Sequence, residues 1–371
     1  MPRLIKYIYE LSGWPEFHWD EKKIGALLSA VRHRQGRVLG KMESLGFPLQ
    51  TEATLHSLTV EVVKSGEIEG ESLNAEQVRS SIARKLGLKI AGLVPADRHI
   101  DGVVEMMLNA TQHYKDTLSA KRLFTWHAAM FPTGTSGMHK IVVGKWRNNS
   151  KDDPMQVVSG ALGKEKVHFR APDAEVLKDE MKMFIDWFND DSNSMDPVLK
   201  AALAHLWFVT IHPFDDGNGR IARAIADMQL ARADASMQRF YSMSAQIRKE
   251  RNDYYDMLEQ TQKGTMEITK WMEWFLHCFD RALMATDETL SVVLNKAKFW
   301  EKHAKTVFNN RQVLLLNKLL DGFVGNLTTS KWGKIAKCSQ DTALRDIQDL
   351  VTRNILQKES GGGRSTSYIL K

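Results

Sequence analysis

The sequence predicts an all-α protein that carries one small β-hairpin beside its helical core and a separate module at its C-terminal end. Along most of the chain, apolar residues recur three or four positions apart, as the buried face of a helix requires. Residues 134–172 break this pattern and are rich in Gly, Ser and Asn. The last 65 residues have their own order of elements and their own charge.

The helical segments are bounded by ordinary start and stop signals. Pro95 closes a loop, and Pro132 ends a later helix, because proline cannot continue one. The predicted helices cover Trp19–Met42, Thr51–Val63, Asn74–Leu86, Val103–Tyr114, Ala120–Phe131, Ala174–Phe188, Pro197–Ile211, Gly219–Ala231, Ile247–Leu258 and Ile268–Met284.

Residues 134–172 contain the alternating fragment Lys166–Phe169 and end at Ala171-Pro172. Alternation of apolar and polar residues is typical of a strand, and glycine-rich flanks are typical of turns. The stretch therefore predicts a loop with a short hairpin.

Composition indicates a soluble globular protein of two or three domains, with 371 residues, 43% hydrophobic and 26% charged. Cys278 and Cys338 have no metal or redox spacing, which favours a reducing compartment. No apolar run is long enough to span a bilayer, and a signal peptide is missing. We expect a cytoplasmic protein with no membrane partner.

The tail, Val307–Lys371, carries ten Lys/Arg and five Asp/Glu of a chain whose net charge is +6. Three predicted helices precede a hairpin around Gly361–Gly363, which is the order of a winged helix-turn-helix. Its positive charge favours an acidic partner such as duplex DNA. A protein-docking module is the alternative. The predicted elements are Arg311–Leu320, Ser330–Lys337, Thr342–Thr352, Ile355–Lys358 and Ser367–Leu370.

The segment from His212 to Arg223 contains the parts that phosphoryl-group chemistry needs. Gly217-Asn218-Gly219 allows backbone N–H groups to approach an anion at the start of a helix. Asp216 is a hard oxygen ligand suited to Mg²⁺. Arg220 and Arg223 lie on one helical face and can bind phosphate oxygens. His212 has an ordinary pKa near neutrality, as a general base requires.

The alternative is a glycine-rich helix connection with a capping Asp and solvated arginines. Against it, the segment resembles the motif of the Fic family, HxFx(D/E)GNGRxxR, at all twelve positions. The resemblance implies a helical core, a β-hairpin flap and transfer of AMP from ATP to a protein hydroxyl. It extends over roughly Ser65 to Leu283.

The resemblance also implies roles for the matched residues. His212 would take the proton of a Ser, Thr or Tyr hydroxyl that attacks the α-phosphate. Asp216 would hold Mg²⁺ against the α- and β-phosphates, and the amides of Gly217–Gly219 would surround them. Arg220 and Arg223 would contact the outer phosphates.

Three further positions follow from the same resemblance. Phe214 would fix the loop in the core, and Asn218 would orient it. Kinase-like members of the family have Lys where this chain has Gly219, so Gly219 favours adenylyl transfer over phosphorylation.

Ser65-Gly66-Glu67-Ile68-Glu69-Gly70 resembles the family's inhibitory motif, (S/T)xxxE(G/N). In that interpretation Ser65, Glu69 and Gly70 belong to a brake, and Glu69 forms a bidentate pair with Arg223 in the place of the γ-phosphate. The alternative is an acidic helix end with a glycine cap.

Two secondary sites follow from the resemblance. Met155–Phe169 matches the flap, which binds the target chain by strand pairing; an ordinary surface hairpin is the alternative. Tyr254, Tyr255 and Gln262 match positions that line the adenine pocket; packing in the core is the alternative.

The resulting prediction has three parts: a helical region with the brake (1–100), a Fic catalytic core (101–290) and a winged-helix-like domain (307–371). The chain is predicted to be a protein adenylyltransferase that uses ATP and Mg²⁺ and modifies another protein or itself. Two alternatives stay open: a nucleotide-sensing, DNA-binding regulator, and an enzyme that removes AMP. The oligomeric state is also open, with a homodimer as one option.

Overall fold

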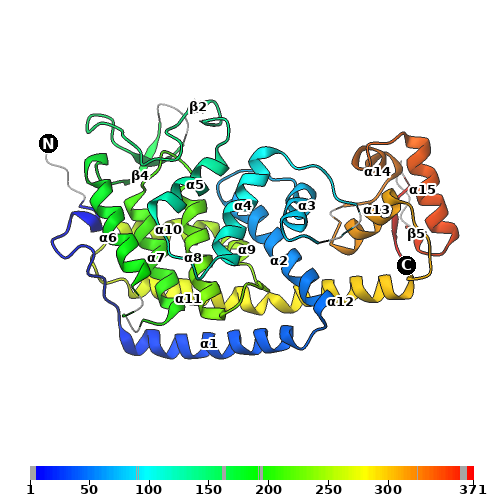
Figure 1. Cartoon of the computed structure of the whole chain (residues 1–371), viewed down its shortest axis with the longest axis horizontal. Helices are drawn as coiled ribbons and strands as arrows, with labels where there is room; N and C mark the ends of the chain where they lie inside the picture. Colours follow the sequence, from blue (N-terminus) through cyan, green and yellow to red (C-terminus); the bar gives the residue numbers. More distant parts are fainter. Residues whose placement is uncertain are drawn as a thin grey trace. The chain divides into compact units, whose positions relative to one another are not determined.

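The computed structural model describes residues 6–88, 90, 92–160, 164–190, 192, 195–323, 325–359 and 366–371, leaving out the side chains of residues 288 and 289. These residues form mainly helices, with short antiparallel strand pairs between them (Figure 1). The predicted, mostly helical class is therefore confirmed. The chain divides into two compact units, Met1–Ile82 with Pro95–Thr286 and Ala83–Val94 with Asp287–Lys371.

The helices of the first unit lie close to their predicted ranges. Those described are η1 (Ile8–Glu10), α1 (Glu21–Glu43), α2 (Phe47–Ile68), α3 (Ala75–Lys85, whose last turn falls in the second unit), α4 (Arg98–Gln112), α5 (Ala120–Met130), η2 (Ala174–Val176), α6 (Leu177–Asn189), α7 (Pro197–Ile211), α8 (Asn218–Asp234), α9 (Met243–Lys249), α10 (Arg251–Gln262) and α11 (Thr269–Met284).

Helix α7 is the core helix of this unit, and every residue from Val198 to Ile211 is buried. A helix that is apolar on all sides must be covered by its neighbours, and α7 packs against α6, α8 and α11. The start of α7 is set locally: the side chain of Asp196 accepts a hydrogen bond from Val198 N, and Pro197 occupies the first turn. The motif segment therefore follows a rigid helix.

Several helix boundaries differ from the prediction by up to five residues, as at both ends of α2 and at the start of α4. α2 begins at Phe47 rather than Thr51, because Pro48 is tolerated within a first turn. The predicted helix Ile247–Leu258 is divided into α9 and α10 at Glu250, whose backbone leaves the helical region at φ −108° and ψ 30°. The Glu250 carboxylate accepts hydrogen bonds from both Arg281 Nε and Arg281 Nη2, at 2.6 and 2.5 Å. That contact comes from a distant part of the chain.

Two strand pairs lie where one hairpin was predicted. β1 (Thr135–Ser136) pairs with β2 (His139–Lys140), and β3 (Gln156–Ser159) pairs with β4 (Lys166–Arg170). The β3–β4 pair is the predicted flap, with a bulge between Val157 and Val158; residues 161–163 lie outside the described part. Its base is fixed because Phe169 is buried against Tyr7 and Tyr9.

The second unit contains the predicted helices of the tail and one more. They are α12 (Thr286–Lys302), α13 (Asn310–Leu320), α14 (Thr329–Ile335) and α15 (Gln340–Thr352), followed by the antiparallel pair β5 (Leu356–Lys358) and β6 (Tyr368–Leu370). The predicted turn Gly361–Gly363 lies outside the described residues. Buried Leu316, Trp332, Ile347 and Leu350 belong to one hydrophobic core. α12 was missed, although its buried Leu290 and Val293 are three residues apart.

Candidate active site

The loop between α7 and α8 is held in a fixed conformation by its own residues. His212 ends α7 with φ +52°, a left-handed conformation that costs about 1 kcal/mol or more for a residue other than glycine. Asn218 Oδ1 accepts from Phe214 N at 2.9 Å, and Asn218 Nδ2 donates to Phe214 O at 2.8 Å. Phe214 is fully buried and stacks on the His127 ring with centroids 4.2 Å apart. The predicted reactive residues therefore lie on a preformed loop.

The His212 ring has a defined tautomer. Its Nδ1 lies 3.2 Å from the carbonyl oxygen of Val209. A carbonyl only accepts, so Nδ1 carries the proton and the lone pair of Nε2 is left to accept one. Burial, together with the charge of the Arg147 guanidinium, lowers the pKa of His212 to about 4. The ring is therefore neutral at pH 7, as a general base must be.

Arg147 connects this loop to the segment after the flap, and the sequence alone did not single it out. Its Nε donates to His212 O at 2.7 Å, its Nη2 donates to Pro172 O at 2.5 Å, and its backbone N donates to Pro213 O at 2.9 Å. Burial lowers the pKa of Arg147 to about 10, so the side chain stays charged at neutral pH. It lies in the glycine-rich stretch, where no periodic pattern marks it.

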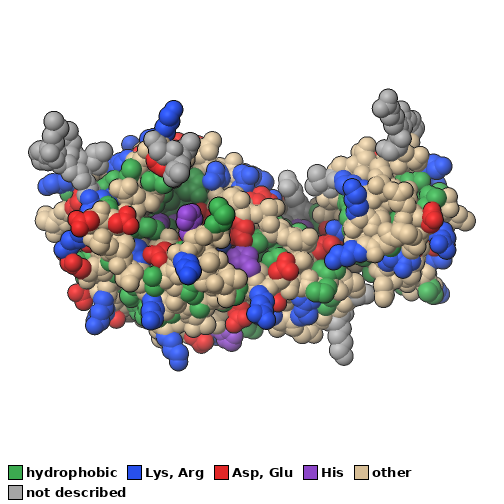
Figure 2. Space-filling model, turned by 90° about the horizontal axis from the view of Figure 1, so that it is seen from above, with side chains coloured by type: hydrophobic (Ala, Val, Ile, Leu, Met, Phe, Trp, Pro, Cys, Tyr) green, Lys and Arg blue, Asp and Glu red, His purple; other side chains and the backbone are tan. Residues whose placement is uncertain are grey.

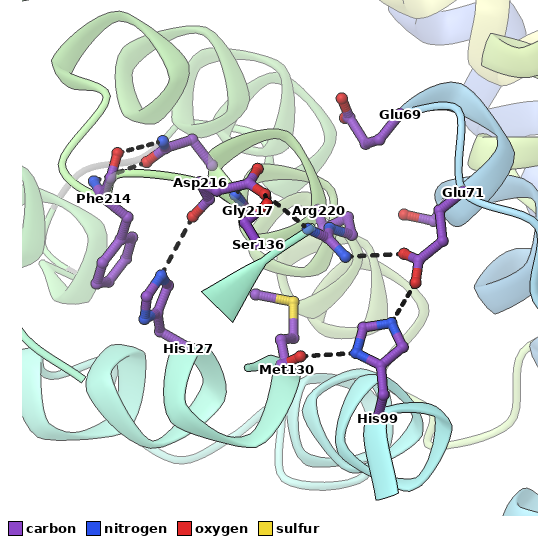
Figure 3. A network of polar contacts seen from close by, with 12 residues as sticks. Glu69, Glu71, His99, His127, Met130, Ser136, Phe214, Asp216, Gly217 and Arg220 are labelled. Atoms are coloured by element: carbon purple, nitrogen blue, oxygen red, sulfur yellow. Dashed lines mark hydrogen bonds and ion pairs between the residues drawn. The ribbon is translucent and has the colours of Figure 1, made fainter. Parts of the chain in front are cut away.

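Asp216 lies at the start of α8, beside the backbone of Gly217 (Figure 3). Its Oδ1 accepts from Gly217 N at 2.5 Å, and its Oδ2 accepts from Ser136 Oγ and lies 3.6 Å from Arg220 Nη2. Gly217 has φ +82°, and a Cβ there would lie 3.0 Å from Met130 and Phe131 side-chain atoms. Glycine is therefore required at this turn.

A cavity of about 630 Å³ opens beside the start of α8. Polar and charged groups from four separate parts of the chain line it together with Phe131. They include Glu69, Glu71, His99, Thr135, Ser136, Asp216 and Arg220. A cavity of this size accommodates a small-molecule ligand.

Arg223 is 2% exposed and contacts the predicted brake directly. Its Nε donates to Ser65 Oγ at 2.9 Å, and its Nη2 donates to Ser65 O at 3.0 Å and to Glu69 Oε1 at 2.8 Å. The predicted contact with Glu69 is present, but the prediction of a bidentate pair was wrong. Ser65 accepts hydrogen bonds from Nε and Nη2 of the guanidinium, so a single oxygen of the Glu69 carboxylate contacts it.

Gly219 makes room for this contact. A Cβ at Gly219 would lie 2.2 Å from Glu69 Oε1, well inside van der Waals contact. Gly70 follows Glu69 with φ +82°, and Glu69 itself ends α2. The glycine cap and the arginine contact therefore occur together.

Helix α10 secures the end of α2. Arg251 Nε donates to Ile68 O at 2.7 Å, and the Tyr255 hydroxyl lies 3.3 Å from Ile68 O and 3.4 Å from Glu69 Oε2. Tyr255 therefore lies beside the brake residue.

The other two predicted adenine-pocket residues have partners inside the protein. Tyr254 is buried, and its hydroxyl bonds His205 Nε2 at 2.9 Å. Gln262 Nε2 donates to Thr210 Oγ1 at 3.3 Å. Neither lines the cavity described above.

Glu71 and His99 were not predicted, yet they complete the polar network in Figure 3. Arg220 Nη1 donates to Glu71 Oε2 at 2.9 Å, and Glu71 Oε1 bonds His99 Nε2. His99 Nδ1 lies 2.7 Å from Met130 O. Glu71 and Arg220 are 149 positions apart, so no local pattern could have paired them.

The described residues contain neither a candidate membrane span nor a candidate metal cluster. None of their helices is long and apolar enough to cross a membrane. They also contain no group of three or more His, Cys, Asp or Glu placed to hold a metal ion.

Residues 117–230 match the model of the Fic/DOC family. The chain carries a Fic/DOC domain. Residues 7–88 match a second model, described as a domain of unknown function, DUF4172. The Fic/DOC match includes the whole α7–α8 loop and both motif arginines.

Curated relatives are named protein adenylyltransferases. A Caenorhabditis elegans protein adenylyltransferase, fic-1, is 34% identical over 100 residues, covering 26% of this chain and 18% of the relative. A Drosophila willistoni protein adenylyltransferase Fic is 29% identical over 226 residues, covering 58% and 39%. The chain thus spans well under half the length of these relatives.

Solved structures share the fold. A Fic family protein from Desulfovibrio desulfuricans G20 superposes with a TM-score of 0.51 at 20% identity, covering 94% of this chain and 95% of that one. A Fic domain containing signalling protein from Bacteroides thetaiotaomicron also gives 0.51 at 20% identity, covering 70% and 97%. At this identity the similarity concerns the fold.

Proposed function

We propose that this Fic/DOC-domain chain is a protein adenylyltransferase, which moves AMP from ATP to a Ser, Thr or Tyr hydroxyl of a protein. The observation that carries the proposal is the neutral His212 ring with an unprotonated Nε2, fixed at the end of α7 and six residues before the first residue of α8. The names of the curated relatives support the same activity.

The reaction would proceed as one displacement. The target oxygen attacks the α-phosphorus while His212 Nε2 takes its proton. A new O–P bond forms, the bond from the α-phosphorus to the oxygen bridging the β-phosphate breaks, and pyrophosphate leaves. The N–H groups at the start of α8 face the phosphates, and Arg220 and Arg223 balance their charge. The protein's contribution is mainly position and electrostatics.

The site fits Mg²⁺ through Asp216. The Asp216 side chain is 42% exposed, lines the cavity and has the Ser136 hydroxyl beside it. Mg²⁺ at nucleotide sites needs one or two carboxylates, because substrate phosphates and waters supply its other ligands. When bound there, Mg²⁺ would neutralise charge on the phosphates.

Gly219 supports adenylyl transfer rather than phosphorylation. Kinase-like members of the family have Lys at the matching position. In this chain the approach of Glu69 Oε1 leaves no space for a side chain at Gly219. A lysine here would displace the brake residue.

Glu69 is proposed to inhibit the enzyme to which it belongs. It occupies Nη2 of Arg223, a group that would otherwise bind an outer phosphate of ATP. ATP would then bind only in a pose unsuited to attack. Ser65 keeps Arg223 in place whether or not Glu69 is bound.

The proposed target lies along the β3–β4 flap. Val158 and Val167 on its two strands are 47% and 40% exposed, which leaves apolar surface for a chain added by strand pairing. The target is another protein or a second copy of this chain.

A second candidate function concerns the C-terminal unit. We propose that α13, α14, α15 and the β5–β6 pair form a winged helix that binds duplex DNA. Arg345 and Gln348 on α15, and Lys334 and Lys337 on and after α14, are exposed. Figure 2 shows several Lys and Arg side chains on the drawn face of the C-terminal unit. Fluorescence anisotropy should detect duplex binding that weakens steeply with salt; no binding at low salt would leave a protein-docking module.

Incubation of a cell lysate with the chain and ATP tests the main proposal. The α-labelled nucleotide should label proteins, γ-labelled ATP should not, and mass spectrometry should locate AMP on a hydroxyl. Transfer of the γ-label instead would refute adenylylation. Loss of AMP from proteins already modified would indicate the reverse activity.

A further inference from the structure

The three residues Glu69-Gly70-Glu71 present two carboxylates to the two arginines of the motif. Glu69 contacts Arg223 Nη2 at 2.8 Å, and Glu71 contacts Arg220 Nη1 at 2.9 Å. Gly70 between them adopts φ +82°, a turn that glycine makes readily. Each arginine of the motif therefore has its own acidic partner from one short segment.

Both arginines are buried, and each retains hydrogen-bonding capacity. Their side chains are 6% and 2% exposed. Arg220 Nε and Arg223 Nη1 have no hydrogen-bond partner among the described residues. A buried N–H group without an acceptor is costly, and a ligand oxygen would satisfy it. The two guanidinium groups are thus only partly satisfied by the carboxylates.

Glu71 is fixed from a second direction by α4. His99 Nδ1 faces the Met130 carbonyl at 2.7 Å, and His99 Nε2 faces the Glu71 carboxylate. Both partners are acceptors, so both ring nitrogens carry protons and the ring is positively charged. The hydrogen bond that His99 donates to the Glu71 carboxylate accordingly raises the pKa of His99. Glu71 lies between two cations, as Figure 3 shows.

The charges of this region cancel in the structure. Glu69, Glu71 and Asp216 face Arg220, Arg223 and His99 through the contacts given above. A site whose cations are already neutralised attracts a polyanion weakly. Removal of the Glu69 charge would leave one positive charge in excess, and removal of the Glu71 charge would leave Arg220 without its carboxylate partner.

Resting on the adenylyl-transfer function proposed above, we infer that Glu69 and Glu71 act together as a two-carboxylate plug that takes the place of the two outer phosphates of ATP. Glu71 holds Arg220 as Glu69 holds Arg223, and His99 anchors the Glu71 half of the plug. ATP must displace both carboxylates for its phosphates to reach the arginines.

Binding of inorganic pyrophosphate to the full chain, measured by calorimetry, tests the plug without requiring activity. Glu71→Gln and Glu69→Gln should each strengthen binding about 5-fold or more, the usual scale of coupling between sites. The double variant should bind more tightly than either single one. Glu67→Gln is the matched control: Glu67 lies on α2, two residues before Glu69, and pairs with Lys64 and Arg248, so binding should not change.

Glu71→Gln would overturn the inference if it bound pyrophosphate like the control or more weakly, since weaker binding would mean that Glu71 merely positions Arg220. Should this variant fail to fold by its melting curve, Glu71→Asp replaces it, because the shorter side chain withdraws the carboxylate from Arg220. That variant should give a smaller gain, and no gain would equally refute the plug.

Label transfer from α-labelled ATP, measured on the same variants, separates this inference from the proposed function. Tighter pyrophosphate binding without transfer would support the plug and refute adenylylation. Label transfer by the wild type, with no gain in pyrophosphate binding by the glutamate variants, would support adenylylation and refute the plug.

Discussion

Replacement of Glu69 by glycine tests the brake most directly. In the structure Glu69 Oε1 lies 2.8 Å from Arg223 Nη2, and the two side chains are 32% and 2% exposed. Loss of one partner of a fully buried pair costs about 3–5 kcal/mol. Because a third of the Glu69 side chain is exposed and Ser65 still holds Arg223, we expect a loss of about 1–2 kcal/mol in the free energy of unfolding.

The same change frees Arg223 for phosphate. Coupling between an inhibitory contact and a ligand is typically about 1–3 kcal/mol, so ATP should bind about 5- to 150-fold more tightly. Labelling from α-labelled ATP should rise while the melting temperature falls by about 2–4 °C. The two readouts therefore move in opposite directions, which a general loss of structure cannot produce.

Arg223→Ala provides the second arm of a double-mutant cycle. It removes the phosphate contact together with the pair, so labelling should fall. The double variant should show no more activity than Arg223→Ala, because both changes act through one contact. If Glu69→Gly lowers the melting temperature and leaves labelling flat, Glu69 is a structural helix-end residue and the brake hypothesis fails.

Three further predictions concern the reactive loop. His212→Ala should lower transfer by about 10²–10⁴-fold and leave ATP binding nearly intact in calorimetry, and retention of most activity would exclude His212 as the base. The imidazole of His212 should titrate near pH 4 by NMR. Since the unfolded chain binds this proton near pH 6.5, its contribution to stability should fall as pH drops from about 6.5 to 4; an NMR midpoint of 6 or higher would contradict the burial argument. Asp216→Ala should weaken Mg²⁺-dependent ATP binding and turnover, and activity unchanged by both this substitution and EDTA would exclude the proposed metal role.

The sequence determined most of the secondary structure, because helices depend on neighbours within four residues. α7 follows from the apolar run that begins after Asp196 and Pro197, and α8 begins directly after Gly217. The loop itself was readable for the same reason: Asn218 bonds Phe214, four residues away.

The helix break at Glu250 was not predicted; the Glu250 carboxylate pairs with Arg281, 31 positions away. The second strand pair was missed because β1 and β2 contain two residues each, too few for an alternating pattern. α12 was missed although Leu290 and Val293 are spaced as on one face of a helix.

The contacts that carry the proposed regulation were decided by the tertiary structure. The motif identified Arg220 and Arg223, and the inhibitory pattern identified Glu69, but nothing in the sequence indicated that Glu71 meets Arg220 or that His99 supports it. These contacts exist because α2, α4 and α8 pack against one another. Side-chain periodicity specifies which face of each helix is buried, whereas the pairing of charges at their ends depends on how the helices pack in space.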